Sequence, residues 1–323
     1  MVMVMTLPGS LLFSPGSVDA RLVILILAMG LSAAVGDAPA RAMGSRHPGE
    51  IAAQAIALFD RRLNRDTRSD ATRRIRGTII TILFLAGALA AGVALAALAA
   101  RSSAGGLIDL AILTVTLDLR GPLARAQKAA ATLAQAERPD AIYGAVRDGI
   151  ARLAADFTDG VVGPVLFYGL VGLPGVLAYC MANRLGRSLG GPVVPYRAFG
   201  WAARRLEALF GAVPARLAGL ILALAAPFVP QARIGHALSV IARASHKHPS
   251  TKRGWPVAAM AGALGLALAA PPDPRRPTPT DPWIGDGRAR AIPADLRRAA
   301  MLFAVGCLLI ALLLAALATA GTR

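Results

Sequence analysis

Long uncharged runs alternate with basic, polar stretches along most of the chain. A helix needs about 20 residues to cross the hydrocarbon core of a membrane, and four uncharged runs hold between 19 and 23 residues. Two further runs are shorter, and one more apolar segment is interrupted by two aspartates. The long runs are 78–100, 161–182, 254–272 and 299–320; the shorter ones are 22–36 and 217–232, and the interrupted segment is 107–119.

Composition supports membrane helices. The chain has 323 residues, of which 55% are hydrophobic and 16% charged, whereas a soluble domain is about a quarter charged. Aromatic residues make up only 5%, which suits helices and does not suit a transmembrane barrel. The two cysteines, Cys180 and Cys307, both lie in apolar runs, where we interpret them as small hydrophobic residues.

The net charge of +17 indicates basic loops. Lys and Arg number 35 against 18 Asp and Glu. In a membrane protein such an excess is typical of cytoplasmic loops that face anionic lipid. No motif in the sequence supports nucleic-acid binding, so anionic lipid is the partner that the charge predicts.

The distribution of basic residues limits the number of crossings. Every loop between the apolar runs is basic, with nine, six, six, five and six Lys and Arg in 37–77, 120–160, 183–216, 233–253 and 273–298. If every run crossed the membrane, these loops would alternate between its two sides, against the positive-inside rule. We therefore predict an all-α, polytopic membrane protein with about four crossings around re-entrant or buried central helices, because glycines and prolines break the central runs. The predicted crossings lie near 22–36, 78–100, 104–119 and 299–320.

A single integral-membrane domain accounts for the whole chain, 1–323. Residues 1–160 hold the N-terminal membrane helices and a basic loop with an amphipathic helix around 51–63. Residues 161–272 form the core broken by Gly and Pro, 273–298 a linker rich in Pro, Asp and Arg, and 299–323 the last membrane helix.

Four strings, in order, carry a family resemblance. They are GDAPARAMGSRHP from Gly36, DFTDGVVGPVLFYGLVGLPGVLAY from Asp156, RAFGWAARRLEALFGAVPARL from Arg197 and HPSTKRGWPVAAMAGALG from His248. Their order and spacing resemble the CobD/CbiB family of cobalamin biosynthesis, the adenosylcobinamide-phosphate synthases, over roughly residues 20–270. The resemblance implies a bacterial inner-membrane enzyme that joins aminopropanol, or its phosphate, to a carboxylate side chain of adenosylcobyric acid. It also implies ATP and Mg²⁺, which binds hard oxygen ligands.

Several polar positions in and near those strings differ from the family pattern. Between residues 160 and 272 the chain has one acidic residue, Glu207, against eleven Arg and Lys. A second hypothesis is therefore a catalytically degenerate relative that acts as a membrane scaffold or subunit with a partner protein. The departures, where the family has mostly acids or amides, are Ala151, Ala155, Gly186, Ala208, Gly211, Lys252 and Val257.

Acidic residues near the second string are the candidates for catalysis and metal binding. Asp156 and Asp159 are three residues apart, so a helix would place them on one face. We predict Asp156 and Asp159 as metal ligands and Asp159 and Glu207 as catalytic residues; the alternative for the aspartate pair is ion pairing with the loop arginines.

Substrate-binding candidates come from the matched strings and from the basic residues near them. Asp37 and His47 belong to the first string, where contact with substrate phosphate or metal and a simple interfacial position are equally good interpretations. The remaining candidates are Arg204, Arg205, Arg216 and Trp255. The three arginines among them, together with Arg184 and Arg187, would attract an anionic ligand or anionic lipid headgroups.

Two aspartates interrupt the apolar segment 107–119. An acid at membrane depth usually faces a partner or a cavity, and a spacing of nine residues puts Asp109 and Asp118 on opposite faces of a helix. Asp109 is the better functional candidate, because Asp118 adjoins Arg120 at the predicted interface. Three histidines, His236, His246 and His248, fit a solvated basic loop better than a metal site.

Overall fold

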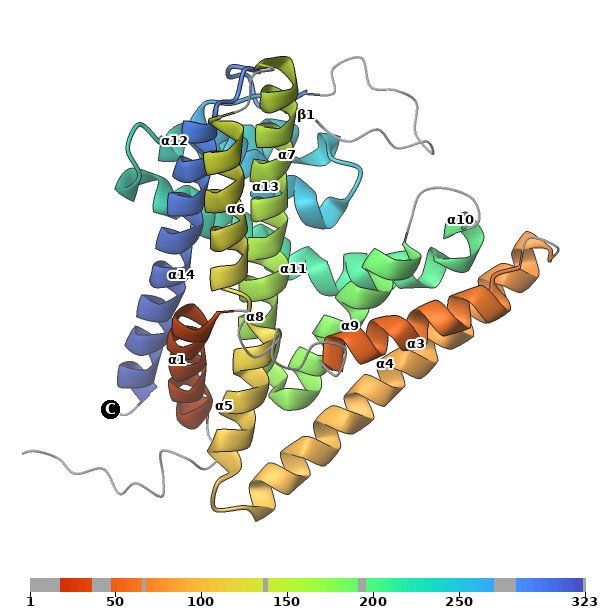
Figure 1. Cartoon of the computed structure of the whole chain (residues 1–323). Helices are drawn as coiled ribbons and strands as arrows, with labels where there is room; N and C mark the ends of the chain where they lie inside the picture. The colour runs from red at the N-terminus through yellow and green to blue at the C-terminus, as the bar shows by residue number, and fades with distance from the viewer. Residues whose placement is uncertain are drawn as a thin grey trace, which may run out of the picture.

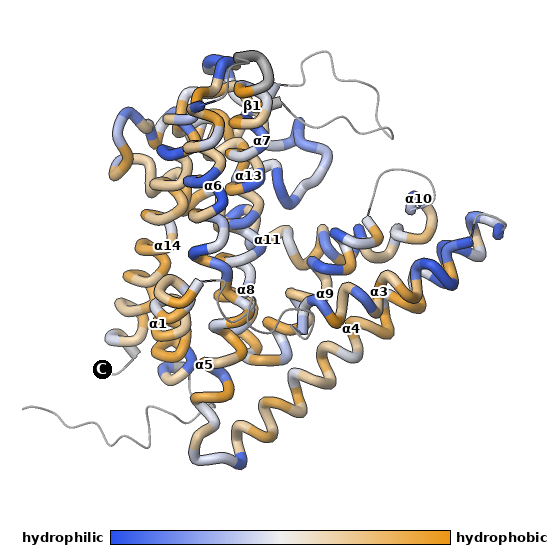
Figure 2. The backbone as a smooth tube through the Cα atoms, in the orientation of Figure 1, coloured by the Kyte–Doolittle hydropathy of each residue, from blue (hydrophilic) through white to orange (hydrophobic). Residues whose placement is uncertain are grey.

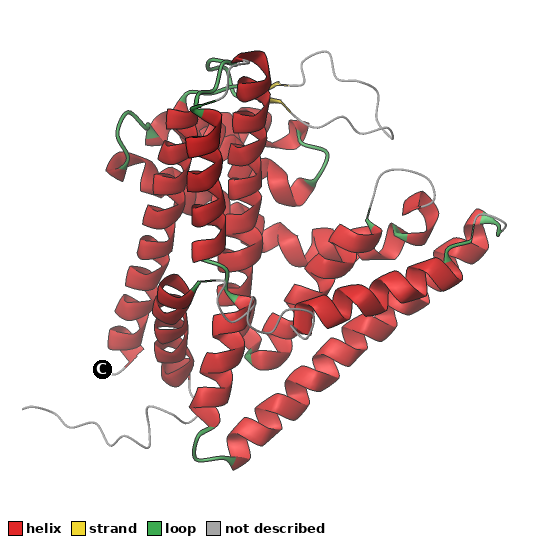
Figure 3. Cartoon of the chain, viewed as in Figure 1, coloured by secondary structure: helices red, strands yellow, loops and turns green. Residues whose placement is uncertain are grey.

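The computed structural model describes residues 18–36, 48–65, 68–135, 139–190, 196–269 and 283–321. Helices dominate the described residues, and one antiparallel pair of two-residue strands lies near one end of the molecule (Figure 3). The helices are α1 (Val18–Val35), α3 (Pro48–Leu63), α4 (Asp70–Arg101), α5 (Gly105–Thr116), α6 (Arg120–Leu133), α7 (Pro139–Phe157), the π-helical turn η2 (Thr158–Val162), α8 (Gly163–Val171), α9 (Leu173–Leu189), α10 (Tyr196–Phe199), α11 (Trp201–Ala225), the 3-10 turn η3 (Ala226–Phe228), α12 (Ile234–Ala244), the 3-10 turn η4 (Ser245–Lys247), α13 (Thr251–Leu264) and α14 (Pro293–Gly321). The strands are β1 (Leu268–Ala269) and β2 (Trp283–Ile284).

Four helical stretches in the described residues are long and apolar enough to cross a membrane: 70–101, 142–171, 201–228 and 293–320. This confirms the predicted helical, multi-pass class. The first and last stretches contain the predicted crossings 78–100 and 299–320, whereas the other two come from α7–α8 and α11–η3. The segment predicted to cross near 104–119 forms α5, whose 12 residues span only about 18 Å.

Of the breaks that glycine and proline predicted in the central helices, one is present and another is not. Gly172 has a φ of +76°, a left-handed conformation that glycine adopts without steric cost, and α8 ends there as α9 begins. The helix does not break at Gly163 and Pro164, because η2 carries it from α7 into α8. The broken runs 161–182 and 217–232, predicted to be re-entrant or buried, instead contribute to two of the long apolar stretches, 142–171 and 201–228. The most buried central helix is α13, in which 11 of 14 residues are buried.

The chain packs into two parts, which Figure 1 shows side by side. We call the larger part, formed by α1, α5–α8 and α11–α14, the bundle; the smaller part, formed by α3, α4, α9 and α10, is the arm. The bundle contains most of the large hydrophobic core. A second, smaller core joins the arm to the start of α11 and includes Ile56, Ile80, Leu185 and Phe199.

Helix α3 is the amphipathic helix predicted around 51–63, and Ile56 is its buried contact with the arm. The neighbouring α4 is apolar along most of its length and hydrophilic at its N-terminal end (Figure 2). Helix α14 starts six residues before the uncharged run at 299, inside the predicted linker. Asp295 explains this start, because its Oδ2 accepts a hydrogen bond from the Ile292 N–H at 2.9 Å, as an acid in a first helical turn commonly does.

Candidate functional site

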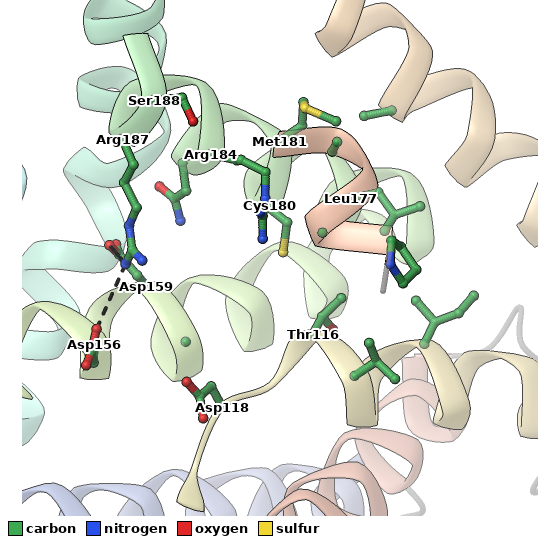
Figure 4. Close-up of a pocket in the computed structure, with 18 of the residues that line it drawn as sticks. Thr116, Asp118, Asp156, Asp159, Leu177, Cys180, Met181, Arg184, Arg187 and Ser188 are labelled. Carbon is green, nitrogen blue, oxygen red and sulfur yellow. Dashed lines mark hydrogen bonds and ion pairs between the residues drawn. The ribbon is translucent and has the colours of Figure 1, made fainter. Parts of the chain in front are cut away.

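A cavity of about 1050 Å³ lies between the arm and the bundle. Small apolar residues of α3, α4 and α5 line one part of its wall, and charged residues of α6, α7, η2 and α9 line the rest. Figure 4 shows Asp156, Asp159, Arg184 and Arg187 on the charged side. The lining polar and charged side chains are Thr116, Asp118, Arg125, Arg152, Asp156, Asp159, Asn183, Arg184, Arg187 and Ser188.

Acidic and basic side chains alternate along the charged wall. Arg187 Nη2 lies 2.7 Å from Asp159 Oδ2 and 4.0 Å from Asp156 Oδ1. Arg125 Nη2 lies 3.2 Å from Asp156 Oδ2 and 3.4 Å from Asp118 Oδ2. Exposure of the carboxylate side chains rises from 5% at Asp159 to 18% at Asp156 and 41% at Asp118, so the row runs from the protein interior toward solvent.

Lys252 closes the buried end of this row. Its Nζ lies 2.7 Å from Asp159 Oδ1, 2.8 Å from Asn183 Oδ1 and 2.9 Å from Glu207 Oε1. The Lys252 side chain is only 1% exposed, and a buried charge is tolerated only when it is paired and hydrogen-bonded. Three of the motif strings, from Asp156, Arg197 and His248, therefore meet at one ammonium group.

Cys180 also lines the cavity. Burial raises the pKa of its thiol to about 12, so the thiol is protonated at neutral pH. The thiolate is the nucleophilic form, so this shift agrees with the sequence interpretation of Cys180 as a small hydrophobic residue.

Comparison with known proteins identifies the family. Residues 25–303 match the profile of the family described as CobD/Cbib protein. The chain belongs to the CobD/CbiB family. "Cobalamin biosynthesis protein CobD" of Rhizobium meliloti (strain 1021) is 33% identical over 309 residues, which cover 88% of this chain and 93% of that protein. The protein of the same name from Brucella suis biovar 1 (strain 1330) is 31% identical over 308 residues, with the same coverage.

A more similar but shorter match comes from Rhodobacter capsulatus, whose "Cobalamin biosynthesis protein CobD" is 41% identical over 161 residues, 50% of this chain and 49% of that protein. No solved structure matches. CobD/CbiB membership confirms the resemblance carried by the four strings and places the chain in cobalamin biosynthesis. The comparisons give no support to the alternative of a catalytically degenerate scaffold.

The structure brings together the acidic candidates of this CobD/CbiB chain. Asp156 and Asp159 line the cavity and pair with arginines, and Glu207 joins Asp159 through Lys252. Their predicted roles in catalysis and metal binding stay predictions. Asp37 and His47 lie outside the described residues.

The predicted arginine group divides in two. Arg184 and Arg187 line the cavity, whereas Arg204, Arg205, Arg216 and Trp255 are not among its lining residues. Arg204 donates hydrogen bonds to the Tyr196 and Arg197 carbonyls, and the other three form cation–π contacts. The guanidinium of Arg205 lies 6.0 Å from the Trp201 ring centre, and that of Arg216 lies 5.7 Å from the Trp255 ring centre.

The part of the chain that the structure describes contains no preformed site for the expected Mg²⁺. No group of three or more His, Cys, Asp and Glu side chains is placed there to hold a metal ion. The oxygen atoms that converge most closely, those of Asp159, Asn183 and Glu207, already surround the Lys252 ammonium. These residues, as arranged, do not fit a divalent cation.

Histidines in the basic region also have protein partners. His236 Nε2 lies 2.7 Å from Asp286 Oδ1, and its Nδ1 lies 2.8 Å from the Gly262 carbonyl oxygen. Hydrogen bonds from Arg243 and His236 lower the pKa of Asp286 to about 2. His236 therefore ties α12 to the segment after β2 instead of lying free in a solvated loop.

Sequence reasoning missed four members of the site: Asp118, Arg125, Asn183 and Lys252. Asp118 was assigned to the interface, but it reaches Arg125 and accepts a hydrogen bond from the Gly121 N–H at the start of α6. Lys252 was counted as a lost amide of the fourth string. The available signal was charge, because a lysine that is buried with the rest of a largely apolar helix needs an acidic partner.

Proposed function

We propose that this chain is the membrane synthase that joins aminopropanol, or its phosphate, to a carboxylate side chain of adenosylcobyric acid. This proposal rests on the mixed charge of the cavity wall between the arm and the bundle. Four arginines, Arg125, Arg152, Arg184 and Arg187, share that wall with three aspartates. A substrate with a phosphate at one end and an ammonium at the other complements such a wall.

The charges of the wall suit the chemistry of amide formation. A carboxylate must first be activated, in this family's case by phosphoryl transfer from ATP, and the activated carbonyl is then attacked by a neutral amine. Phosphate groups bind to guanidinium forks through paired, charge-assisted hydrogen bonds. Asp118 and Asp156, the more exposed carboxylates, would receive the amine end of the smaller substrate.

The buried residues would position this wall. Asp159 holds Arg187 at 2.7 Å, and Lys252 fixes Asp159 from behind. We assign the predicted catalytic residues Asp159 and Glu207 to this positioning role. The inner membrane is the proposed location, with anionic lipid at the basic N-terminal end of α4; a protein partner stays a prediction.

Complementation tests this function. The gene is expressed in a bacterial strain that lacks its own synthase and is supplied with cobyric acid, and cobalamin-dependent growth is measured. We expect growth with the natural chain and strongly reduced growth with Arg187→Ala. Arg205→Ala is the matched control, because it removes an exposed arginine that does not line the cavity.

Two results of this experiment would contradict the proposal. If the natural chain is present and folded in the membrane but growth does not return, the synthase assignment is wrong. If growth returns equally with both arginine variants, the charged wall is not the substrate site.

A further inference from the structure

Oxygen atoms of the protein surround the Lys252 ammonium in the way that they surround a bound cation. A lysine ammonium has three N–H donors, and three oxygens from three different elements lie within 2.9 Å of Nζ. Asp159 comes from η2, Asn183 from α9 and Glu207 from α11. The ammonium donates hydrogen bonds to Asn183 and Glu207 and forms an ion pair with Asp159.

This set of oxygens is of the kind that divalent cations bind. Two carboxylates and one amide oxygen are hard ligands, and Mg²⁺ usually takes one or two carboxylates and keeps several of its waters. Lys252 balances one of the two negative charges, and Arg187 pairs with Asp159 to balance the other. Removing the lysine charge would leave a net negative, oxygen-lined space.

Two glycines make room for this pair, Gly211 for Lys252 and Gly186 for Glu207. A Cβ at Gly211 would lie 2.3 Å from Lys252 Cδ, and a Cβ at Gly186 would lie 2.2 Å from Glu207 Oε2. Both distances are far below a normal van der Waals contact, so larger residues at these positions are incompatible with the present arrangement. Gly186, Gly211 and Lys252 come from three helices, α9, α11 and α13, and the structure places all three at one point.

We propose that the Lys252 ammonium is a permanent, covalently attached cation of this cluster. Without it, Asp159, Asn183 and Glu207 form a site for a divalent cation. In the natural chain, the Lys252 side chain thus takes the place that a metal ion would otherwise take between these three residues. This inference does not depend on the synthase reaction.

Binding of Mn²⁺ to the purified full-length protein tests the proposal. Mn²⁺ alone is the probe, and the bound fraction is measured by electron paramagnetic resonance in lipid nanodiscs. Lys252→Ala should gain one Mn²⁺ per chain, bound at least tenfold more tightly than any Mn²⁺ on the natural chain. Lys128→Ala, which removes an exposed lysine, should bind like the natural chain.

A second substitution assigns the site. Adding Glu207→Gln to Lys252→Ala should weaken Mn²⁺ binding at least tenfold, because it removes one carboxylate from the cluster. If folded Lys252→Ala binds no more Mn²⁺ than the natural chain, the proposal is overturned. It is also overturned if the natural chain already binds Mn²⁺ in a way that Asp159→Asn abolishes.

Folding of the variant provides an independent readout. If Lys252→Ala does not fold in ordinary medium, Mn²⁺ or Mg²⁺ supplied during expression and purification should restore folded protein. Restoration supports the proposal, and failure to restore it contradicts the proposal.

Discussion

The Tyr168 hydroxyl donates a hydrogen bond to Asp109 Oδ2 and so joins α8 to α5 within the buried part of the bundle. The other carboxylate oxygen, Oδ1, is buried and has no hydrogen-bond partner among the described residues. Asp109 was expected to face a partner or a cavity, and it faces this tyrosine without lining the cavity of the candidate site.

Tyr168→Phe should lower the free energy of unfolding by about 1–3 kcal/mol, because it leaves a buried carboxyl group without a donor. Thermal unfolding in detergent measures the loss. Tyr143→Phe on α7, at a partly exposed position, should have little effect. Combining Tyr168→Phe with Asp109→Leu should recover part of the stability, since removing both partners is less costly than removing one. Equal losses in the two tyrosine variants would contradict this interpretation.

Gly163→Ala should destabilise the junction between η2 and α9. The added Cβ would lie 2.0 Å from Tyr179 Cζ, and Tyr179 is fully buried, with its hydroxyl donating to the Thr158 carbonyl at 3.2 Å. Overpacking of this kind costs about 1–3 kcal/mol, visible as a lower unfolding temperature and a lower yield of folded protein.

The control for this substitution is Gly87→Ala on α4, where no atom lies within 4 Å of the added Cβ. This variant should be as stable as the natural chain. If both alanine variants behave alike, contact with Tyr179 is not what requires glycine at 163.

Stability should fall in mild acid because of His248. Burial, with a contribution from nearby Arg253, lowers the pKa of His248 to about 4, while an unfolded histidine has a pKa of about 6.5. Below pH 6.5 the unfolded chain therefore binds a proton that the folded chain does not. The free energy of unfolding should drop by about 3 kcal/mol as the pH falls from above 6.5 to about 4.

Thermal unfolding measured across this pH range, with and without His248→Asn, tests the effect. The asparagine Oδ1 can accept the hydrogen bond that the Ser250 N–H now donates to Nδ1 at 2.9 Å, and the amide does not titrate. The variant should therefore show a flatter dependence on pH. An unchanged slope would assign the acid sensitivity to other groups.

Helix α4 should cross the membrane with its basic end in the cytoplasm. Its N-terminal side carries most of the nearby positive charge, from Arg68, Arg73, Arg74 and Arg76, and its C-terminal side ends at Arg101. The positive-inside rule places the richer side in the cytoplasm. In a background without the two native cysteines, an impermeant maleimide should label Ser103→Cys in intact spheroplasts and Arg68→Cys only after lysis. Labelling of both positions from one side would show that α4 does not cross.

Much of the architecture follows from runs of uncharged residues, but the candidate site does not. The uncharged runs located α4 and α14, because a helix that lies in lipid consists of a long run of uncharged residues. They did not identify α7–α8 as a long helix, because charged residues of α7 interrupt the apolar pattern; one of them, Asp156, pairs with arginines inside the fold. Pairs such as Lys252 with Asp159, 93 positions apart, depend on tertiary packing and leave no local pattern.

The motif strings showed which parts of the chain matter without showing how they combine. In the sequence, Gly186, Gly211 and Lys252 lie in three separate segments with no visible relation to one another. In space they lie together around one ammonium group, because α9, α11 and α13 pack against one another.

The site also has a consequence for dividing the gene. A cut between α6 and α7 would leave Asp118 and Arg125 on one fragment and their partner Asp156 on the other. Neither fragment alone would carry a whole row of alternating charges, so activity would return only when the two polypeptides are co-expressed and find each other in the same membrane.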